Sequence, residues 1–228
     1  ITGSVTVTGS VADIKAAYAS NTSGTINGLG NEAITVSGAE IISSSDLTDL
    51  KALTTGVVTA TLSGTSVTAA SLNTLDANTT ENVIAGVVTT LTGTAADVNS
   101  AYASTGITGL GDEAVTLSDT ALKASTLSTV DGNTTGTVNA GTVTSLTGTA
   151  AEVSSVYSAS GITGLGDEAV TISDTSIDVS LLQTLDEATT GKIDASSLKT
   201  ITGTGAKAEL AFGSPGISGL TFDASSYL

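Results

Sequence analysis

The amino-acid sequence predicts a repeat solenoid, a β-rich α/β fold in which short coils of chain stack on one another. Two observations support this prediction: a 55-residue internal repeat, and a strand-like and a helix-like segment in each half of that repeat. Sequence similarity at a fixed period is the signature of stacked architectures. The repeat therefore carries the fold prediction, ahead of any single motif.

The repeat is visible in eight-residue blocks that recur at a constant offset. The block GLGDEAVT at residues 109–116 recurs unchanged at residues 164–171, an offset of 55. The block LTGTAADV at residues 91–98 recurs at residues 146–153 with one Asp-to-Glu change, again at an offset of 55. An earlier copy, GLGNEAIT, occupies residues 28–35.

The 55-residue unit is itself double, so we divide the chain into a single array, residues 1–228, of about eight coils of about 27–28 residues. Each coil is predicted to hold a short strand, a short helix and a return segment. No coil buries its apolar residues alone, and stacking on neighbours supplies the core. The coils are predicted to begin near residues 6, 34, 61, 89, 116, 144, 171 and 199.

Helix starts are indicated by capping-box patterns, in which a Ser or Thr is followed three residues later by an acid. The patterns stand at residues 10–13, 94–97, 149–152 and 175–178. An apolar stripe at i, i+3 and i+4 follows, as in Val98, Ala101 and Tyr102. Such helices hold about two or three turns and need packing to be stable. Whether every coil or only alternate coils carry a helix stays open at this point.

The composition excludes several function classes. The 228 residues include no His, Cys, Met, Trp or Arg, and the formal net charge is -16. Imidazole is the usual acid–base group near neutral pH, and thiolate and imidazole are the main transition-metal ligands. Cationic side chains dominate affinity for nucleic acid. We therefore expect no enzyme, no catalytic residue, no resident cofactor and no nucleic-acid partner. No apolar run is long enough to span a bilayer, so we also expect no membrane insertion.

Recurring carboxylates are the candidates for a metal site. A Glu follows each Gly-Leu-Gly turn, and in the two later copies an Asp stands beside that Glu and another Asp stands before the following helix. Stacking could bring such acids into register, and Ca²⁺ prefers about six to eight oxygen ligands. The alternative is that these acids are solvated or cap the positive ends of short helices. The candidate calcium ligands are Asp112, Glu113, Asp119, Asp167, Glu168 and Asp174.

Aromatic and threonine positions allow two interpretations each. Four aromatic residues, each nine residues after a repeat glycine, predict an aromatic stack in the core or, alternatively, a sugar-binding row. Alternating threonines, as at residues 6–8 and 142–144, fit a solvent-facing strand or, alternatively, an ice-binding ladder. The four aromatic residues are Tyr18, Tyr102, Tyr157 and Phe212.

The blocks at residues 91–98, 109–116 and 129–136 together resemble the repeat regions of giant secreted or cell-surface proteins of marine cyanobacteria and other Gram-negative bacteria. These are type I-secreted, adhesin-like or swimming-motility-type repeat proteins. The resemblance spans roughly residues 6–204. It implies an extracellular or cell-surface location and an adhesive or coat-like role. It supplies no catalytic residue.

The expected function is therefore a structural repeat protein of a surface layer, filament or adhesin stalk. Its expected partner is another copy, by end-to-end stacking, or continuation of the same array. The alternatives are a carbohydrate- or ice-binding repeat module and an enzyme acting on polysaccharides. A specific site usually interrupts its repeat, and the insertion in this sequence is small: Asn21-Thr22-Ser23 adds about three residues to the first coil.

Overall fold

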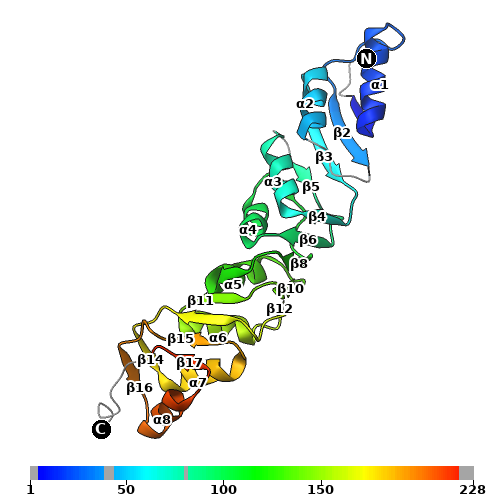
Figure 1. Ribbon diagram of the computed structural model, residues 1–228. Helices are drawn as coiled ribbons and strands as arrows, with labels where there is room; N and C mark the ends of the chain where they lie inside the picture. The colour runs from blue at the N-terminus through cyan, green and yellow to red at the C-terminus, as the bar shows by residue number, and fades with distance from the viewer. Residues whose placement is uncertain (1–4, 39–43, 80–81, 221–228) are drawn as a thin grey trace. The chain divides into compact units, whose positions relative to one another are not determined.

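The computed structural model describes residues 5–38, 44–79 and 82–220. The chain divides into two compact units, Ile1–Ala114 and Val115–Leu228. Each unit is built of repeated strand–helix segments whose strands pair in parallel (Figure 1). The repeated α/β architecture predicted from the sequence is thus present in both units.

The first unit holds four helices: α1 (Val11–Thr22), α2 (Ser44–Leu53), α3 (Ala69–Ala77) and α4 (Ala95–Ala103). Its main parallel sheet has the order β1 (Thr6–Gly9), β2 (Ala33–Gly38), β3 (Val58–Leu62), β5 (Val83–Ile84) and β7 (Ile107–Thr108). A second pair joins β4 (Ser66–Thr68) to β6 (Thr90–Gly93).

The second unit holds α5 (Ala124–Asn133), α6 (Ala150–Ser158), α7 (Val179–Ala188) and α8 (Gly205–Gly213). One sheet pairs β8 (Ala114–Leu117), β10 (Val138–Asn139) and β12 (Ile162–Thr163). Another has the order β9 (Ala121–Lys123), β11 (Ser145–Gly148), β13 (Ala169–Ile172), β15 (Ile193–Asp194) and β17 (Ile217–Ser218). A last pair joins β14 (Ser176–Asp178) to β16 (Thr200–Thr202).

Paired strands follow one another at a nearly constant step along the chain, which we call the register step. Ser145 lies opposite Ala169, and Ile193 lies opposite Ile217. The first step is longer, from Thr6 to Ala33, because it contains the insertion at residues 21–23. Two ordinary steps, as from Leu146 through Val170 to Ile193, are shorter than the 55-residue repeat. Each repeat therefore begins a new sheet, with β4, β9 and β14 starting at residues 66, 121 and 176.

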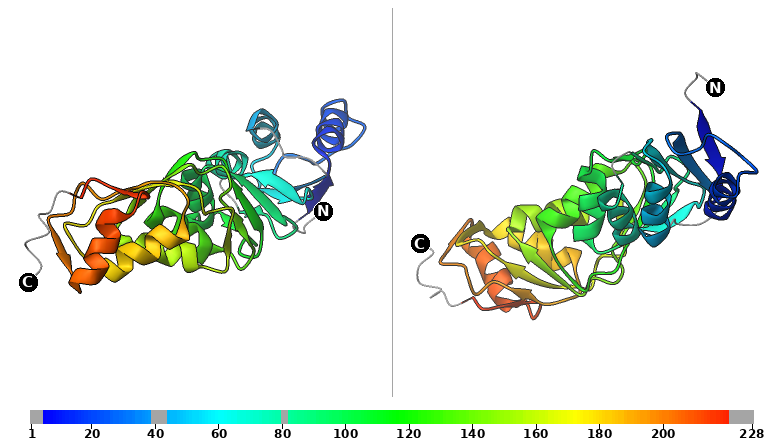
Figure 2. Two further views of the ribbon diagram at one scale, coloured as in Figure 1. Left: turned by 60° about the horizontal axis from the view of Figure 1, so that its bottom comes forward. Right: turned by 90° about the horizontal axis from the view of Figure 1, so that it is seen from above.

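The helices are short and depend on one buried face. In α4 the buried residues are Ala95, Val98 and Ala101, which share a face of the helix. Neighbouring helices contact one another, α1 with α2 and α3 with α4 in the first unit, and α5, α6 and α7 in succession in the second (Figure 2). The sequence left open whether every coil or only alternate coils carry a helix. In the described residues each of the eight expected coils contains one helix, α1 to α8 in chain order. The structure places each expected coil start inside a strand or on the residue before one.

Three of the four predicted helix starts are confirmed. The hydroxyls of Ser10, Thr94 and Thr149 each accept a hydrogen bond from the backbone N–H three residues later. At Thr149 the capping box is complete, because the Glu152 side chain also accepts from the Thr149 backbone N–H at 2.8 Å.

The fourth predicted start, at residues 175–178, is wrong. Residues Ser176–Asp178 form β14, and α7 begins at Val179 with Asp178 as its N-cap, which accepts from Ser180 N–H at 2.8 Å. Ile177 decides the difference, since this β-branched side chain is buried and pairs with Ile201 of the neighbouring strand. In the described part of the chain, no helix combines the length and the apolar character that crossing a membrane requires.

Candidate functional sites

The glutamate that follows each Gly-Leu-Gly turn lies inside the fold. Glu113 and Glu168 are 0 % exposed, and Glu32 is 6 % exposed. Each carboxylate accepts a hydrogen bond from the backbone N–H two residues earlier, at 2.9 Å from Gly166 to Glu168 and at 2.6 Å from Gly30 to Glu32. The turn thus folds around its own acidic side chain.

A tyrosine from the last turns of the preceding helix donates to the same carboxylate. The Oη–Oε2 distance is 2.9 Å for Tyr157 and Glu168, 2.7 Å for Tyr102 and Glu113, and 3.2 Å for Tyr18 and Glu32. We call each of these a Tyr–Glu pair. The residues of a pair are 11 positions apart in the later copies and 14 in the first, a difference that matches the three-residue insertion. The pair is therefore a property of the repeat.

Hydrogen bonding explains how the pair tolerates burial. A buried carboxylate requires polar partners, because desolvation disfavours its charge. The backbone hydrogen bond from Gly30, and then those of Tyr18 and Asn31, hold the pKa of Glu32 below its usual range against the effect of burial. Burial raises the pKa of Tyr18, and it raises that of Tyr157 well above the usual range. At neutral pH the first pair is a neutral phenol that donates to an ionised carboxylate.

The turn is fixed further by a threonine of the next strand–helix segment. Thr189 Oγ1 donates to the backbone carbonyl of Glu168 at 3.1 Å and accepts from Gly191 N–H at 3.0 Å. Thr54 donates in the same way to the carbonyl of Glu32 at 2.7 Å. A Cβ on Gly191 would lie 2.0 Å from the Glu168 carbonyl oxygen. Glycine at this position is therefore required by the close approach of the two segments.

The six candidate calcium ligands fall into four settings. Glu113 and Glu168 belong to Tyr–Glu pairs, with carboxylate oxygens that already accept from N–H and phenol donors. Asp112 and Asp167 lie beside them at the turn surface, and Asp119 is partly buried. Within the residues that the structure describes, no group of three or more acidic side chains is arranged to hold a metal ion.

The sixth candidate, Asp174, caps a helix, though not the one that follows it. Its Oδ2 accepts from the backbone N–H of Ala150 at 2.7 Å, at the first residue of α6. Ala150 belongs to the preceding strand–helix segment, one register step earlier in the chain. A carboxylate at this place satisfies a free N–H group and faces the positive end of the helix dipole. The sequence leads us to expect capping by this acid, but its partner lies in the neighbouring segment.

The aromatic row occupies the last turns of α1, α4, α6 and α8. Tyr18 is buried at 4 % exposure, whereas Tyr102, Tyr157 and Phe212 are partly buried. The tyrosine hydroxyls are bonded within the Tyr–Glu pairs. Sugar binding by aromatic residues relies on accessible ring faces, which buried Tyr18 does not offer.

Threonine rows are present on the sheet of the first unit. Thr35 lies opposite Thr59, and Ser37 lies opposite Thr61, with alternate residues of β3 buried. The next strand continues the second row with Ile84 rather than a hydroxyl. By contrast, the threonines at residues 142–144 of the second unit donate to backbone carbonyls of the preceding segment.

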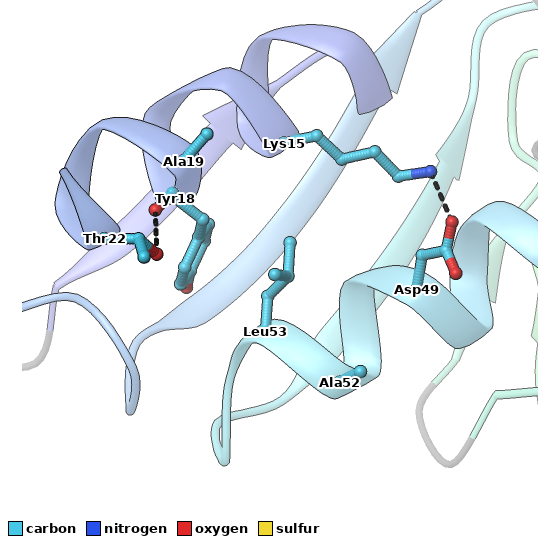
Figure 3. Close-up of a pocket in the computed structure, with 7 residues that line it drawn as sticks. All are labelled: Lys15, Tyr18, Ala19, Thr22, Asp49, Ala52 and Leu53. Atoms are coloured by element: carbon cyan, nitrogen blue, oxygen red, sulfur yellow. Dashed lines mark hydrogen bonds and ion pairs between the residues drawn. The ribbon is translucent and has the colours of Figure 1, made fainter.

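A pocket of about 390 Å³ lies between α1 and α2 (Figure 3). At one end Lys15 Nζ bonds to Asp46 at 2.9 Å and to Asp49 at 2.7 Å. These hydrogen bonds, Asp49 first, raise the pKa of Lys15. Sequence reasoning missed this pocket, although the insertion at residues 21–23 marks the segment that forms it. The lining residues are Lys15, Tyr18, Ala19, Thr22, Asp49, Ala52 and Leu53.

Comparison with known proteins identifies no relative: no family model, no curated protein and no solved structure matches this chain.

Proposed function

We propose that this chain is an extracellular structural repeat protein, a solenoid segment of a surface layer, filament or adhesin stalk. The observation that carries the proposal is the recurrence of the Tyr–Glu pair from one sequence repeat to the next, as Tyr102–Glu113 and Tyr157–Glu168. An enzyme gathers titratable groups in a pocket where they can reach a substrate. Here the recurring phenols and carboxylates bond to each other and to the backbone, which supports a structural role over a catalytic one.

The charge of the chain fits this role. A net charge of -16 keeps a long repeat array soluble and opposes lateral clumping, at the cost of self-repulsion. Salt or calcium is therefore expected to raise the melting temperature. Acids at the turn surface such as Asp112 and Asp167 would take divalent counter-ions. A melting temperature that stays flat across millimolar calcium at constant ionic strength would remove the specific-calcium part of the proposal.

Electron microscopy of the purified chain at several concentrations, with and without calcium, tests the proposal. Long uniform fibres that grow with concentration would support a filament or coat subunit. Short single rods at every concentration would support a stalk whose array continues within one polypeptide. Compact particles with no elongated form would contradict the solenoid and the structural role together.

The threonine rows favour a second candidate function, binding of ice or of a carbohydrate by the sheet of the first unit. The hydroxyls of Thr35 and Thr59 and of Ser37 and Thr61 form two adjacent rows on β2 and β3. Inhibition of ice recrystallisation and glycan-array binding are the measurements. The doubly substituted variant Thr59→Lys, Thr61→Lys should abolish either activity, and wild-type protein without either activity contradicts this candidate.

A further inference from the structure

The pocket between α1 and α2 combines apolar walls with an acidic end. Tyr18, Ala19, Ala52 and Leu53 line it together with the stem of Lys15 (Figure 3). The ammonium group of Lys15 is shared by two carboxylates, those of Asp46 and Asp49. The ammonium group and the two carboxylates together carry one net negative charge. The pocket therefore favours a binding partner that presents an apolar side chain with a cation beside it.

A surface of that kind lies on α8 in the second unit. Leu210 is 68 % exposed, the highest value for a large hydrophobic side chain among the described residues. Lys207, one helical turn earlier, is exposed on the same side of the helix. Ala206 and Gly213, which flank Leu210 on that side, are small, so no other large apolar side chain of α8 borders the leucine there.

Both surfaces depart from the repeat. The positions equivalent to Leu210 in the two preceding repeats hold Ser155 and Ser100, and those equivalent to Lys207 hold Glu152 and Asp97. The exposed leucine and its lysine thus replace a serine and an acid. The pocket, likewise, occurs where the insertion lengthens the first register step. A repeat that served only internal stacking would not require either change.

We propose that α8 of one copy of this chain docks into the α1–α2 pocket of a second copy. Leu210 enters the apolar pocket, and Lys207 faces the carboxylates of Asp46 and Asp49. Within its own chain the charge of Lys207 contributes to lowering the pKa of Asp178, after the larger effect of hydrogen bonding from Ser180. The proposal rests on the proposed function and names the surfaces through which copies associate.

This contact would be heterologous, because the inserted side chain and its pocket belong to different surfaces of the molecule. A heterologous contact that does not close into a ring produces open, growing assemblies. Each bound copy presents a further pocket and a further Leu210. Where such contacts do not close into a ring, the two surfaces supply a route to growing assemblies that needs no additional protein.

Sedimentation velocity over a concentration series tests the contact with a matched pair of variants. Leu210→Asp should raise the apparent dissociation constant at least about tenfold, since it places a charge in an apolar pocket beside two acids. Val87→Asp makes the same type of change at another exposed hydrophobic residue, 46 % exposed, and should leave association unchanged. Equal effects of the two variants would overturn the proposal.

Disulfide trapping provides the second measurement, because the chain has no cysteine of its own. A chain carrying only Ala52→Cys is mixed with a differently tagged chain carrying only Leu210→Cys. Mixed dimers in excess over both homodimers are expected. Equal yields of all dimers would contradict the contact. So would dilution-independent cross-linking within a chain that carries both cysteines.

The outcomes separate this inference from the proposed function. Fibres that persist in Leu210→Asp would retain the structural role and overturn the docking contact. A wild-type chain that never associates would overturn both the docking contact and the proposal of a filament subunit. The proposal of a stalk built within one polypeptide would remain.

Discussion

The phenol oxygen of Tyr157 lies 2.9 Å from Oε2 of Glu168, a carboxylate that is 0 % exposed. The bond joins the end of α6 to the residue before β13. The same geometry recurs one sequence repeat earlier between Tyr102 and Glu113. A polar contact inside an otherwise apolar core fixes the path of the turn, because a buried carboxylate without its donors would be strongly unfavourable.

Tyr157→Phe tests that contact most directly. The substitution keeps the ring and removes one hydrogen-bond donor from a buried carboxylate, so we expect a loss of about 1–3 kcal/mol in the free energy of unfolding. Urea denaturation measures it. A double-mutant cycle with Glu168→Gln should show coupling between the two positions, and strictly additive effects would mean that the hydrogen bond contributes nothing.

Gly191→Ala should destabilise the second unit by about 1–3 kcal/mol or more, because the new Cβ would lie 2.0 Å from the Glu168 carbonyl oxygen. Gly132→Ala is the matched control. Gly132 is helical, in α5, and its added Cβ would meet no atom within 4 Å. There alanine should stabilise by about 0.5–1 kcal/mol. Thermal unfolding of both variants measures the two effects. A Gly191→Ala variant with unchanged stability would contradict the close approach of Gly191 to the Glu168 carbonyl.

Thr149→Ala removes the side-chain cap of α6 and should cost about 0.5–2 kcal/mol. Thr204 occupies the same N-cap position of α8 but makes no side-chain cap hydrogen bond. Thr204→Ala should therefore be close to neutral. Both variants replace an N-cap threonine by alanine, and denaturant titration measures the free energy of unfolding of each. A similar loss of stability in both would mean that the cap hydrogen bond is not its cause.

Acid should weaken the first unit through Glu32. The pKa of Glu32 in the fold is below the ordinary value of 4.5, chiefly because Gly30 N–H donates to it. A lowered pKa contributes stability above the unfolded-state pKa, and that contribution is lost as pH falls from about 4.5 through the folded-state value.

Melting temperatures recorded from about pH 6 to about pH 2.5 measure this loss. Glu32→Gln should flatten the decline, whereas Glu209→Gln, at an exposed position of α8, should leave it unchanged. A wild-type melting temperature that is independent of pH across this range would refute the linkage.

Local signals in the sequence predict much of the fold. The capping patterns at Ser10, Thr94 and Thr149 are sufficient to locate three helix starts, because a cap involves residues only three positions apart. The pattern ending at Asp178 fails because strand pairing with a distant segment, through Ile177, overrides a local helix signal.

Contacts between segments are harder to predict. The register step is set by strand pairing and has no counterpart in the 55-residue sequence period. The Tyr–Glu pair leaves a usable signal, since Tyr102 and Tyr157 stand at the same distance from Glu113 and Glu168. The pocket near Lys15 depends on how two helices separate around an insertion, which residue patterns alone do not encode.

The start of a new sheet at residues 66, 121 and 176 has an evolutionary consequence. Duplication or deletion of one whole 55-residue repeat of coding sequence leaves every strand pairing intact. Gain or loss of a single register step would instead shift the strands relative to the 55-residue repeat, so that a new sheet would no longer begin at the same position in each repeat. Unequal recombination between copies is therefore expected to produce longer or shorter chains that still fold. Selection can then adjust the number of repeats without redesigning the contacts within each repeat.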